Sequence, residues 1–491
     1  MEKYLILIYL LLLINLILPN DDIISFKLET FQYKGEYTNP TIINKLYDTN
    51  LVTTMNIGSN YYPLKAFINS QNNYFFISTK CNIQKSFFAE YKVNFNYDRH
   101  KSFSFQNTSS FDLSFSQESH ACTAREEFEI FKANKMETVK ETINFILTED
   151  TKEEIPNCLH IGLLENKNKE SIFSEYNLIT QLKQKNHIKE SGWFIIFNKL
   201  ITNDNLLVSA DELLNLKGNL IIGDYPHNYE PKKFYESQFL KTYSKFENNI
   251  MKWELKFNKI YYLYNNKEIK ILGENSVGFD PSNFFIIVPE NYFDSIYENY
   301  FKKYKDDNIC NYDYLDEYIT IYCEKSDKFS LNEIKKFPTL YLEHIELEYT
   351  FEISFQDLFI EKDGKFWLLL ISDSEYRKDQ WVLGNIFMRK YQLFFNLETK
   401  EIGFYNPKLE KKEKKSAKDS SKTFLYVLLI LALCIIVAGI VYFIKMKFYP
   451  SVIKKKRANE LDDDFEYVSH KNIGLNKDND NQLFNGNINQ D

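Results

Sequence analysis

The sequence predicts a mainly β protein with two lobes and one C-terminal transmembrane helix. Short segments of β-branched, aromatic or alternating residues recur between residues 51 and 404, whereas helical patterns are confined to residues 176–184 and 292–304. Two long apolar runs lie near the two ends of the chain, and the stretch between them is too long for one ordinary core. We therefore expect two β-rich lobes.

The clearest strand patterns lie in residues 64–68, 74–77, 111–115, 193–197, 218–223 and 253–262. Segments rich in Asn and Lys separate them and are typical of surface loops. The expected organisation is an N-terminal segment 21–50, an N-terminal β lobe 51–225, a C-terminal β lobe 226–406 and a charged stalk 407–423.

The two ends of the chain predict a type I membrane protein. Lys3 is followed by an apolar run over residues 4–18, which is typical of a signal peptide that we assign to residues 1–20. The alternative is a buried N-terminal helix. Residues 424–444 carry no charge over 21 positions, enough to cross a bilayer. Basic residues lie on both sides of this run, within 409–422 and at 454–457, so charge alone does not orient it. The signal peptide does, and we expect a luminal or extracellular N-terminal part and a cytosolic tail over 445–491.

Charge and cysteine usage narrow the function classes. The net charge is −8 and the region between the apolar runs has no basic block, so no nucleic-acid partner is expected. Six cysteines are present, and none has the spacing of a metal site, so no metal or cofactor is expected. Cys434 lies in the apolar run, which leaves five cysteines in an oxidising compartment. Asn107 begins a glycosylation sequon.

Several motifs occur in an order that is typical of one family. Residues 381–391 read WVLGNIFMRKY and residues 402–404 read IGF, while IGLL stands at 161–164 and GNLIIGD at 218–224. Together they resemble the pepsin-like aspartic proteases, over roughly residues 51–406. The resemblance implies a bilobal pepsin-like fold, a cleft between the lobes for a peptide or protein ligand, and a disulfide between Cys310 and Cys323. The family activity is that of an aspartic endopeptidase, which uses two carboxylates that share a proton.

The second of the two aspartate turns is partly kept. Residues 277–289 read VGFDPSNFFIIVP and resemble the strand, turn and strand around that aspartate. The resemblance places Asp280 at the catalytic position, with Pro281 and Ser282 in place of the usual Ser/Thr-Gly. Because proline has no N–H, we expect the hydrogen bonds of this turn to change. Without the resemblance, Asp280 is interpreted as a turn-capping aspartate.

The first aspartate turn has lost its acid. Residues 67–77 read FINSQNNYFFI, so Asn69 stands where the first aspartate is expected, with Ser70 and Gln71 in the Thr and Gly positions. No aspartate occurs between residues 49 and 97. An amide has neither the charge nor the proton of a carboxyl group, although it can still form hydrogen bonds.

The hairpin that covers the cleft in this family also differs. Residues 111–119 resemble that hairpin, and Phe115 stands at the usual tyrosine position without its hydroxyl. His120 and His160 are interpreted as surface or loop histidines.

These departures favour a membrane-anchored, catalytically impaired family member that binds a peptide or protein in its cleft. Two alternatives remain open. One is an active aspartic endopeptidase of the secretory system or the cell surface, and the other is a structural surface protein.

Overall fold

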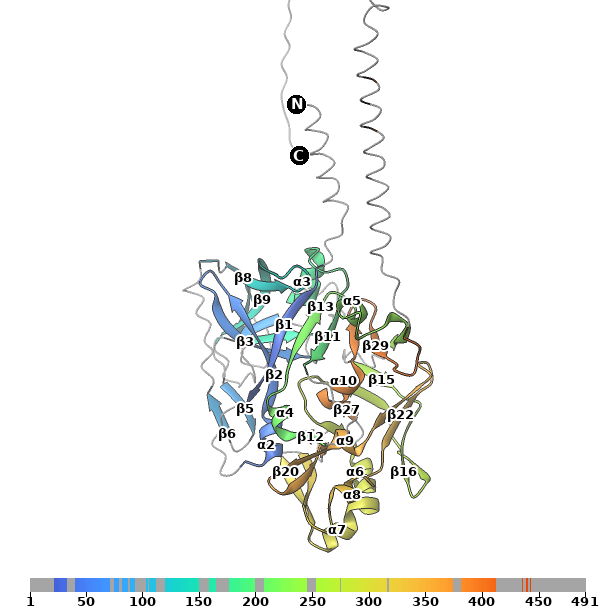
Figure 1. Ribbon diagram of the computed structural model, residues 1–491. Helices are drawn as coiled ribbons and strands as arrows, with labels where there is room; N and C mark the ends of the chain where they lie inside the picture. The colour runs from blue at the N-terminus through green and yellow to red at the C-terminus, as the bar shows by residue number, and fades with distance from the viewer. Residues whose placement is uncertain are drawn as a thin grey trace, which may run out of the picture. The chain divides into compact units, whose positions relative to one another are not determined.

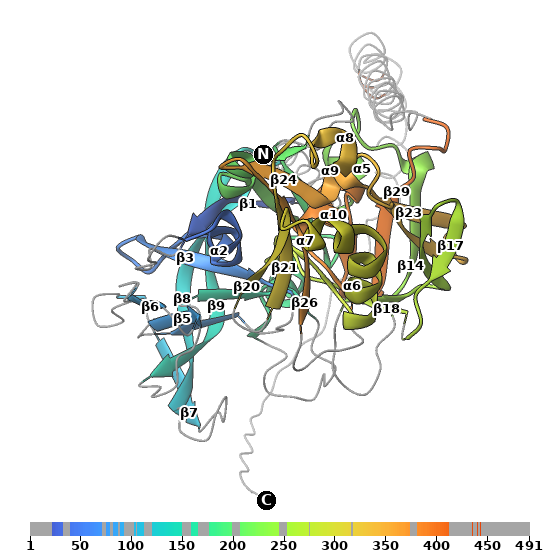
Figure 2. The same cartoon turned by 90° about the horizontal axis from the view of Figure 1, so that it is seen from below.

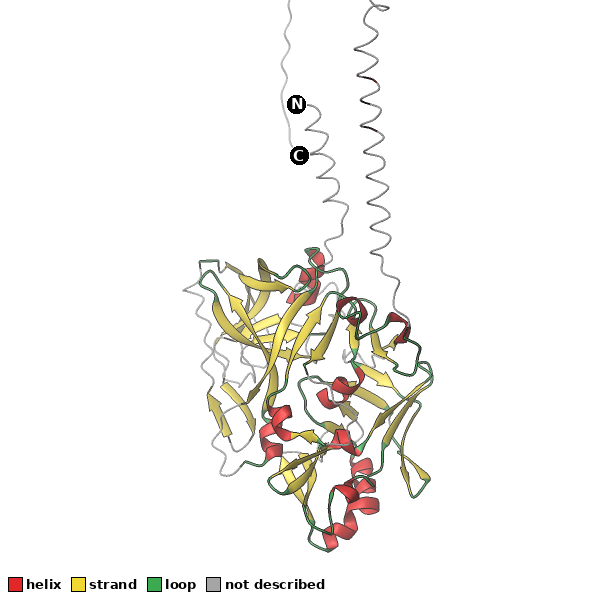
Figure 3. Ribbon diagram, viewed as in Figure 1, coloured by secondary structure: helices red, strands yellow, loops and turns green. Residues whose placement is uncertain are grey.

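The computed structural model describes residues 22–32, 40–70, 75–78, 82–86, 89–92, 103–104, 106–111, 120–149, 159–164, 176–198, 207–244, 253–273, 275–315, 318–373 and 381–411, with Ile435, Gly439 and Tyr442. The chain divides into two units, Met1–Glu413 and Lys414–Asp491. The first unit is mainly β, as the sequence predicts, and its helices are short (Figure 3).

The larger sheet of the described residues has thirteen strands (Figure 1). In spatial order they are β14 (Phe239–Tyr243), β29 (Glu401–Tyr405), β28 (Phe394–Asn396), β11 (Gly192–Phe197), β13 (Lys217–Ile222), β1 (Ile24–Gln32), β2 (Thr49–Ile57), β3 (Tyr62–Asn69), β10 (Leu159–Gly162), β4 (Phe75–Ser78), β9 (Glu137–Glu149), β8 (His120–Lys132) and β7 (Gln106–Phe111). Strands from both halves of the sequence therefore share one sheet.

A second sheet has ten described strands, all but one from the second half of the sequence. They are β12 (Val208–Ser209), β24 (Phe359–Lys362), β25 (Lys365–Leu368), β21 (Tyr318–Glu324), β26 (Leu370–Asp373), β19 (Ile286–Val288), β27 (Trp381–Leu383), β18 (Ser276–Phe279) and β15 (Glu254–Lys256), with β20 (Cys310–Leu315) paired to β21. Two small sheets are formed by β17 (Lys267–Lys270), β16 (Lys259–Tyr264), β22 (Leu340–His344) and β23 (Tyr349–Ile353), and by β5 (Asn82–Ser86) and β6 (Ala89–Lys92).

The described helices of the first unit are short and connect strands. They are α2 (Ile42–Tyr47), α3 (Leu178–Gln184), α4 (Ala210–Leu214), α5 (Pro226–Tyr229), the 3-10 turn η3 (Glu236–Gln238), α6 (Glu290–Ile296), the π-helical segment η4 (Tyr297–Phe301), α7 (Lys302–Asp306), α8 (Leu331–Ile334), α9 (Phe355–Leu358) and α10 (Asn385–Tyr391). The expected helices near 176–184 and 292–304 correspond to α3 and to the run from α6 to α7.

A four-strand arrangement occurs twice. In the first copy β3 pairs parallel with β10, β10 pairs antiparallel with β4, and β4 pairs parallel with β9. In the second copy β18 pairs parallel with β27, β27 antiparallel with β19, and β19 parallel with β26. The spatial order is the same in both, with the fourth strand in sequence inserted between the first and second. The two copies bring the C-terminal ends of β3 and β18 to equivalent positions.

Aromatic side chains join the two copies. Trp193 and Trp253 are both buried, and the indole N–H of each donates to the carbonyl oxygen of Leu163, at 3.2 and 3.1 Å. The Trp193 ring stacks on Phe395 at 4.3 Å, and the Trp253 ring lies 5.0 Å from the same phenyl ring. The Trp253 carbonyl in turn accepts the N–H of Phe279 at 2.9 Å. Because a carbonyl oxygen has two lone pairs, Leu163 can satisfy both indoles.

The N-terminal segment contributes a strand and a helix to the first unit. Strand β1 lies between β13 and β2, with Ile24 opposite Ile222 and Glu29 opposite Val52. Helix α2 begins with a capping box at Thr41, and its Ile42, Ile43 and Leu46 side chains are buried. Figures 1 and 2 show α2 beside β20 of the second sheet. Residues 22–32 and 40–50 therefore belong to the folded body.

One strand expectation is wrong in its extent. Residues 253–262 form two strands, β15 and β16, that belong to different sheets. The break lies at Phe257 and Asn258, where the N–H of Phe257 donates to the carbonyl of Asn275 and that of Asn258 to Glu343. The phase of the apolar alternation changes at this corner, from Trp253, Leu255 and Phe257 to Ile260 and Tyr262, and this change was the signal that could have located it.

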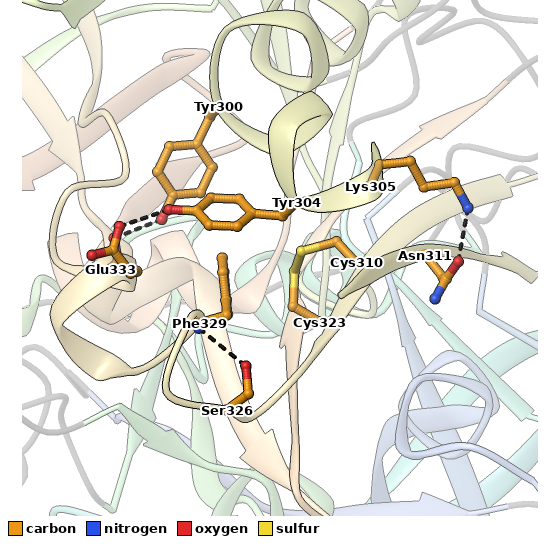
Figure 4. The surroundings of a disulfide bond; sticks show 9 residues. All are labelled: Tyr300, Tyr304, Lys305, Cys310, Asn311, Cys323, Ser326, Phe329 and Glu333. Atoms are coloured by element: carbon orange, nitrogen blue, oxygen red, sulfur yellow. Dashed lines mark hydrogen bonds between the residues drawn. A yellow bond between two sulfur atoms is a disulfide. The ribbon is translucent and has the colours of Figure 1, made fainter. Parts of the chain in front are cut away.

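The expected disulfide between Cys310 and Cys323 is present (Figure 4). The two cysteines lie opposite each other on β20 and β21, and both are buried. In Figure 4 the rings of Tyr304 and Phe329 lie beside the bond, with centroids 4.8 Å apart. The pair therefore closes the hairpin against an aromatic core.

The expected membrane segments lie outside the described residues. Residues 1–20 are not described, and neither is the 424–444 segment apart from Ile435, Gly439 and Tyr442. Within the described part of the chain, no helix has both the length and the apolar character that crossing a membrane requires.

A buried ion-pair cluster fixes the start of the folded body. Asp22 is fully buried, and its carboxylate lies 2.7 Å from the ammonium of Lys132 and 2.6 Å from that of Lys135. Burial alone would raise the pKa of Asp22, but the hydrogen bonds and charges of the two lysines outweigh it and hold this pKa below its usual value. The N–H of Ala133 also donates to the Ile23 carbonyl at 2.7 Å.

We expect Asp22→Asn to lower the free energy of unfolding by about 3 kcal/mol, because it leaves the buried Lys132 with only the half-exposed Glu137 carboxylate, 3.9 Å away. Since the folded-state pKa of Asp22 lies below the unfolded one, its stabilisation is complete above the ordinary aspartate value of about 3.9 and disappears as pH falls through the folded-state value. Urea unfolding of both proteins between about pH 2 and 7 measures this. The control is Lys135→Gln, which leaves Asp22 paired with Lys132; because the Lys135 side chain is 39% exposed, its loss should cost below about 1 kcal/mol. Equal losses for the two variants would contradict the prediction.

Candidate functional site

The candidate site lies where the two four-strand arrangements end. Asn69 is the last residue of β3 and lies opposite Gly162 of β10. Phe279 is the last residue of β18 and lies opposite Leu383 of β27. One residue further along each chain, Asp280 comes opposite Gly384. Asn69 and Asp280 thus occupy equivalent positions in the two copies.

Gly384 permits the chain to pass close beneath the Asp280 turn. A Cβ atom at this position would lie 2.3 Å from the carbonyl oxygens of both Asn283 and Phe285. The next N–H, that of Asn385, donates to the same Asn283 carbonyl at 2.7 Å. Only glycine fits so close an approach to the backbone.

Neutral donors surround one oxygen of the Asp280 carboxylate. Oδ1 accepts the N–H of Ser282 at 3.0 Å and its hydroxyl at 2.6 Å, and the Ser70 hydroxyl lies 3.3 Å away. The N–H that reaches the carboxylate belongs to Ser282, the residue after Pro281, so the missing N–H of the proline does not affect this contact. The carboxyl side chain is held in one orientation.

The link between the two copies is one-sided. From the first copy, the Ser70 hydroxyl reaches the carbonyl of Phe279 at 3.4 Å as well as Asp280. The equivalent residue of the second copy is Pro281, which has neither a hydroxyl nor an N–H. Pro281 therefore cannot donate the equivalent hydrogen bond to the first copy. The approximate symmetry of the strands does not extend to the polar groups.

Asn69 contacts a histidine that the sequence analysis placed elsewhere. His160 lies in β10 and is 2% exposed, so its interpretation as a surface or loop histidine is wrong. Its Nδ1 lies 3.3 Å from the Nδ2 atom of Asn69. The imidazole stacks on the Phe76 ring at 4.1 Å and 17°. The alternation within β10, where Leu159 and Ile161 face the core, was the signal that could have placed this side chain on the other face of the strand.

A cavity of about 320 Å³ brings the two turns together. Asn69 and His160 line it from the first copy, and Asp280 and Ser282 from the second. Its other lining residues are Leu46, Tyr47, Thr49, Asn50, Phe67, Ile68, Asn283, Phe284, Ile287, Tyr318, Ile371 and Val382. The wall is mixed, with polar groups near the two turns and apolar side chains around them.

Helix α2 forms one side of this cavity and contacts the second sheet. The Tyr47 ring lies 5.9 Å from that of Tyr318. At the start of the helix, the Thr41 hydroxyl donates to the Asp313 carboxylate at 3.1 Å. Burial raises the pKa of Asp313, although the Thr41 hydrogen bond acts in the opposite direction. The N-terminal segment therefore helps to position the cavity wall.

A larger cavity of about 720 Å³ contains none of the predicted site residues. It lies against β1, β2, β8 and β13, where Lys27, Glu29, Glu129 and Lys217 are among its lining residues. Volume alone does not select the functional site here, and the convergence of Asn69, His160 and Asp280 is the stronger indication.

The remaining predicted site residues are not tested. Gln71 and Phe115 lie outside the described residues, and the side chain of Asn107, on β7, is not described. No group of three or more potential metal ligands is found among the residues that the structure describes.

Comparisons with known proteins do not place the chain in a family. No protein-family model matches the sequence, and no curated protein matches it.

We expect Gly384→Ala to destabilise the protein by at least about 2 kcal/mol, because its Cβ would collide with two backbone carbonyl groups. The control is Gly364→Ala, where no atom lies within 4 Å and the cost comes from the positive φ of +71°, about 1 kcal/mol. Chemical unfolding of the two variants measures the difference. A Gly384→Ala protein as stable as the wild type would show that the two carbonyls can move aside.

Proposed function

We propose that the protein is a membrane-anchored relative of the pepsin-like aspartic proteases that binds an extended peptide but does not cleave it efficiently. The observation that supports this most is the equivalence of Asn69 and Asp280. Asn69 ends the first strand of one four-strand arrangement and Asp280 directly follows the first strand of the other. Both line one cavity, yet one of them is an amide and the other an acid.

Hydrolysis by such a site needs two carboxyl groups that share one proton. The charged member accepts a proton from water while the protonated member polarises the peptide carbonyl. The Asn69 amide can neither accept nor release that proton in the working pH range. Loss of one member of a cooperating catalytic set typically lowers the rate by several orders of magnitude.

The one-sided link between the copies is consistent with binding rather than catalysis. Ser70 fixes the Asp280 side of the site, whereas Pro281 cannot fix the Asn69 side in the same way. A catalytic pair requires both groups to be held closely in place. Peptide binding requires less, since main-chain hydrogen bonds and side-chain pockets can supply it.

We expect the wild-type protein to leave a peptide library uncut between about pH 3 and 7, and Asn69→Asp to gain cleavage by at least about a hundredfold over it. The gain should disappear in the double variant Asn69→Asp/Asp280→Ala, because both acids are then needed. Mass spectrometry of the digested library measures cleavage. Wild-type activity that is lost in Asp280→Ala would instead establish an active endopeptidase with another partner acid.

The ends of the chain support a type I membrane arrangement for this protein. The apolar run 424–444 and the basic residues after it are sequence observations, as is the apolar run that precedes Asp22. The ectodomain would then face the lumen or the cell exterior, and residues 445–491 the cytosol.

Expression of the full chain in sealed microsomes tests this arrangement. We expect glycosidase treatment to reduce the apparent mass of the wild type, and an Asn107→Gln variant to lack that shift. External protease should remove a tag placed after Asp491 and spare a tag placed beside Asp22. Protection of the C-terminal tag would contradict the type I orientation.

A further inference from the structure

Three strands of the larger sheet diverge and leave an opening between them. Strand β1 pairs with β8 at Ile24 and with β2 only from Glu29 onward, and β2 pairs with β8 at Ile57. Between these points, no strand among the described residues pairs with 25–28 of β1 on the side away from β13, or with 53–56 of β2 on the side away from β3. The cavity of about 720 Å³ is lined by residues of both stretches, so it lies at this opening.

Main-chain groups of Lys27 and Thr54 face the opening. The N–H of Thr30 donates toward β13, to the Leu216 carbonyl. Because the polar groups of successive residues in a strand point to opposite sides, those of Glu29 and Lys27 point away from β13. Glu29 begins the pairing with β2, and continuation of the same register would pair Lys27 with Thr54. Since the pairing stops before them, the N–H and C=O groups of both residues remain for water or a ligand.

The charged side chains around the opening balance one another. The cavity is lined by two lysines and two glutamates, which are Lys27, Lys217, Glu29 and Glu129. Glu29 also pairs with Lys65, and Glu129 accepts the amide N–H of Asn56 at 2.6 Å. With two groups of each sign, the lining selects neither an anion nor a cation.

Amide groups and one aromatic ring complete the lining. The side-chain amides of Asn198 and Asn219 make no hydrogen bond within the described part of the chain, so their donors and acceptors are available to a ligand. The Phe131 ring is half-buried and adds apolar surface. The volume falls within the range of about 300–1,000 Å³ that is typical of small-molecule sites.

We propose that this opening binds a neutral polyhydroxylated ligand, namely a sugar unit of a saccharide. A hydroxyl group both donates and accepts, so neighbouring hydroxyls of one sugar ring match the mixed N–H and C=O groups of Lys27 and Thr54. The apolar C–H face of the ring can pack on Phe131. The inference does not depend on the proposed peptide-binding function, because it concerns a different cavity.

An added peptide strand fits this opening less well than a sugar. β1 pairs with β2 at one end of the opening and with β8 at the other. Both ends are therefore closed along the strand direction, and a chain laid between β1 and β2 would have no exit. A compact ring that enters from the exposed side of Lys27 and Thr54 avoids this obstacle.

The first experiment locates binding on the main chain. The full chain in nanodiscs is labelled with ¹⁵N-lysine and ¹⁵N-threonine and titrated with the methyl glycosides of glucose, mannose, galactose and N-acetylglucosamine. The two amide signals are assigned with Lys27→Arg and Thr54→Ser. We expect at least one glycoside to bind with a Kd of about 1 mM and to shift the amide signals of Lys27 and Thr54. Binding that shifts neither signal, or no binding up to about 50 mM of any glycoside, would overturn the proposal.

The second experiment tests the side chains. We expect Asn219→Ala to weaken binding of the same glycoside about tenfold, the effect of about one hydrogen bond. Asn332→Ala is the matched control, because Asn332 is exposed on α8 and does not line the cavity, and it should leave the affinity unchanged. Equal affinities of the wild type and Asn219→Ala would contradict the proposed site.

A charged sugar tests the neutral character of the ligand. Methyl glucuronide should bind within about threefold of methyl glucoside, since the charged lining residues balance. Binding of the glucuronide that is more than about tenfold tighter and is lost in Lys27→Gln would instead identify an anion site and overturn the proposal.

Discussion

The arrangement of the site depends on the two hydrogen bonds that the carbonyl group of Leu163 accepts. It accepts the indole N–H groups of Trp193 and Trp253, and Trp253 also accepts the N–H of Phe279 through its own carbonyl. Leu163 directly follows β10, and Phe279 ends β18. The two hydrogen-bonded tryptophans therefore connect the end of one four-strand arrangement to the end of the other. In a dry environment these polar groups cannot exchange their partners for water, which makes their geometry costly to change.

This connection explains why the turns of the two copies meet although they are more than two hundred residues apart in sequence. Ser70 lies within hydrogen-bond distance of Asp280 only because β3 and β18 end at the same place. The strand arrangement beneath the turns is the same in the two copies, whereas the polar groups at the cavity surface differ. On one side an acid is held by Ser282, and on the other an amide is held by His160.

The sequence predicted the features that depend on local pattern. The β-rich class, the helices near residues 178–184 and 290–306 and the disulfide of Cys310 follow from periodicity or from motif order. The resemblance also named Asn69 and Asp280, and the structure brings both into one cavity. Whether these residues form a protease-derived site stays a prediction.

Features that depend on long-range pairing could not be predicted. The incorporation of β1 between β13 and β2 requires partners almost two hundred residues away, which no local window contains. The burial of His160 was missed because a single histidine in an apolar strand is assigned by composition unless its neighbours across the sheet, Phe67 and Phe76, are known. The expected change in the hydrogen bonds of the Asp280 turn was based on the missing N–H of Pro281. The hydrogen bond to the carboxylate, however, is donated by the N–H of Ser282.

The position of Asn69 is compatible with the proposed replacement of an acid by an amide without loss of the fold. Two carboxylates that face each other at close range repel, so one must hold a proton or the pair raises the free energy of the folded state. An amide has the same shape as a carboxyl group without its charge, and Asn69 faces the cavity and His160 rather than the aromatic core. An amide in place of an acid at residue 69 would therefore remove a repulsion and leave the packing of Trp193, Trp253 and Phe395 unchanged. At such a position, stability favours the amide and catalysis favours the acid. Under the proposed function, an amide at residue 69 favours stability over cleavage and leaves the cleft available for binding.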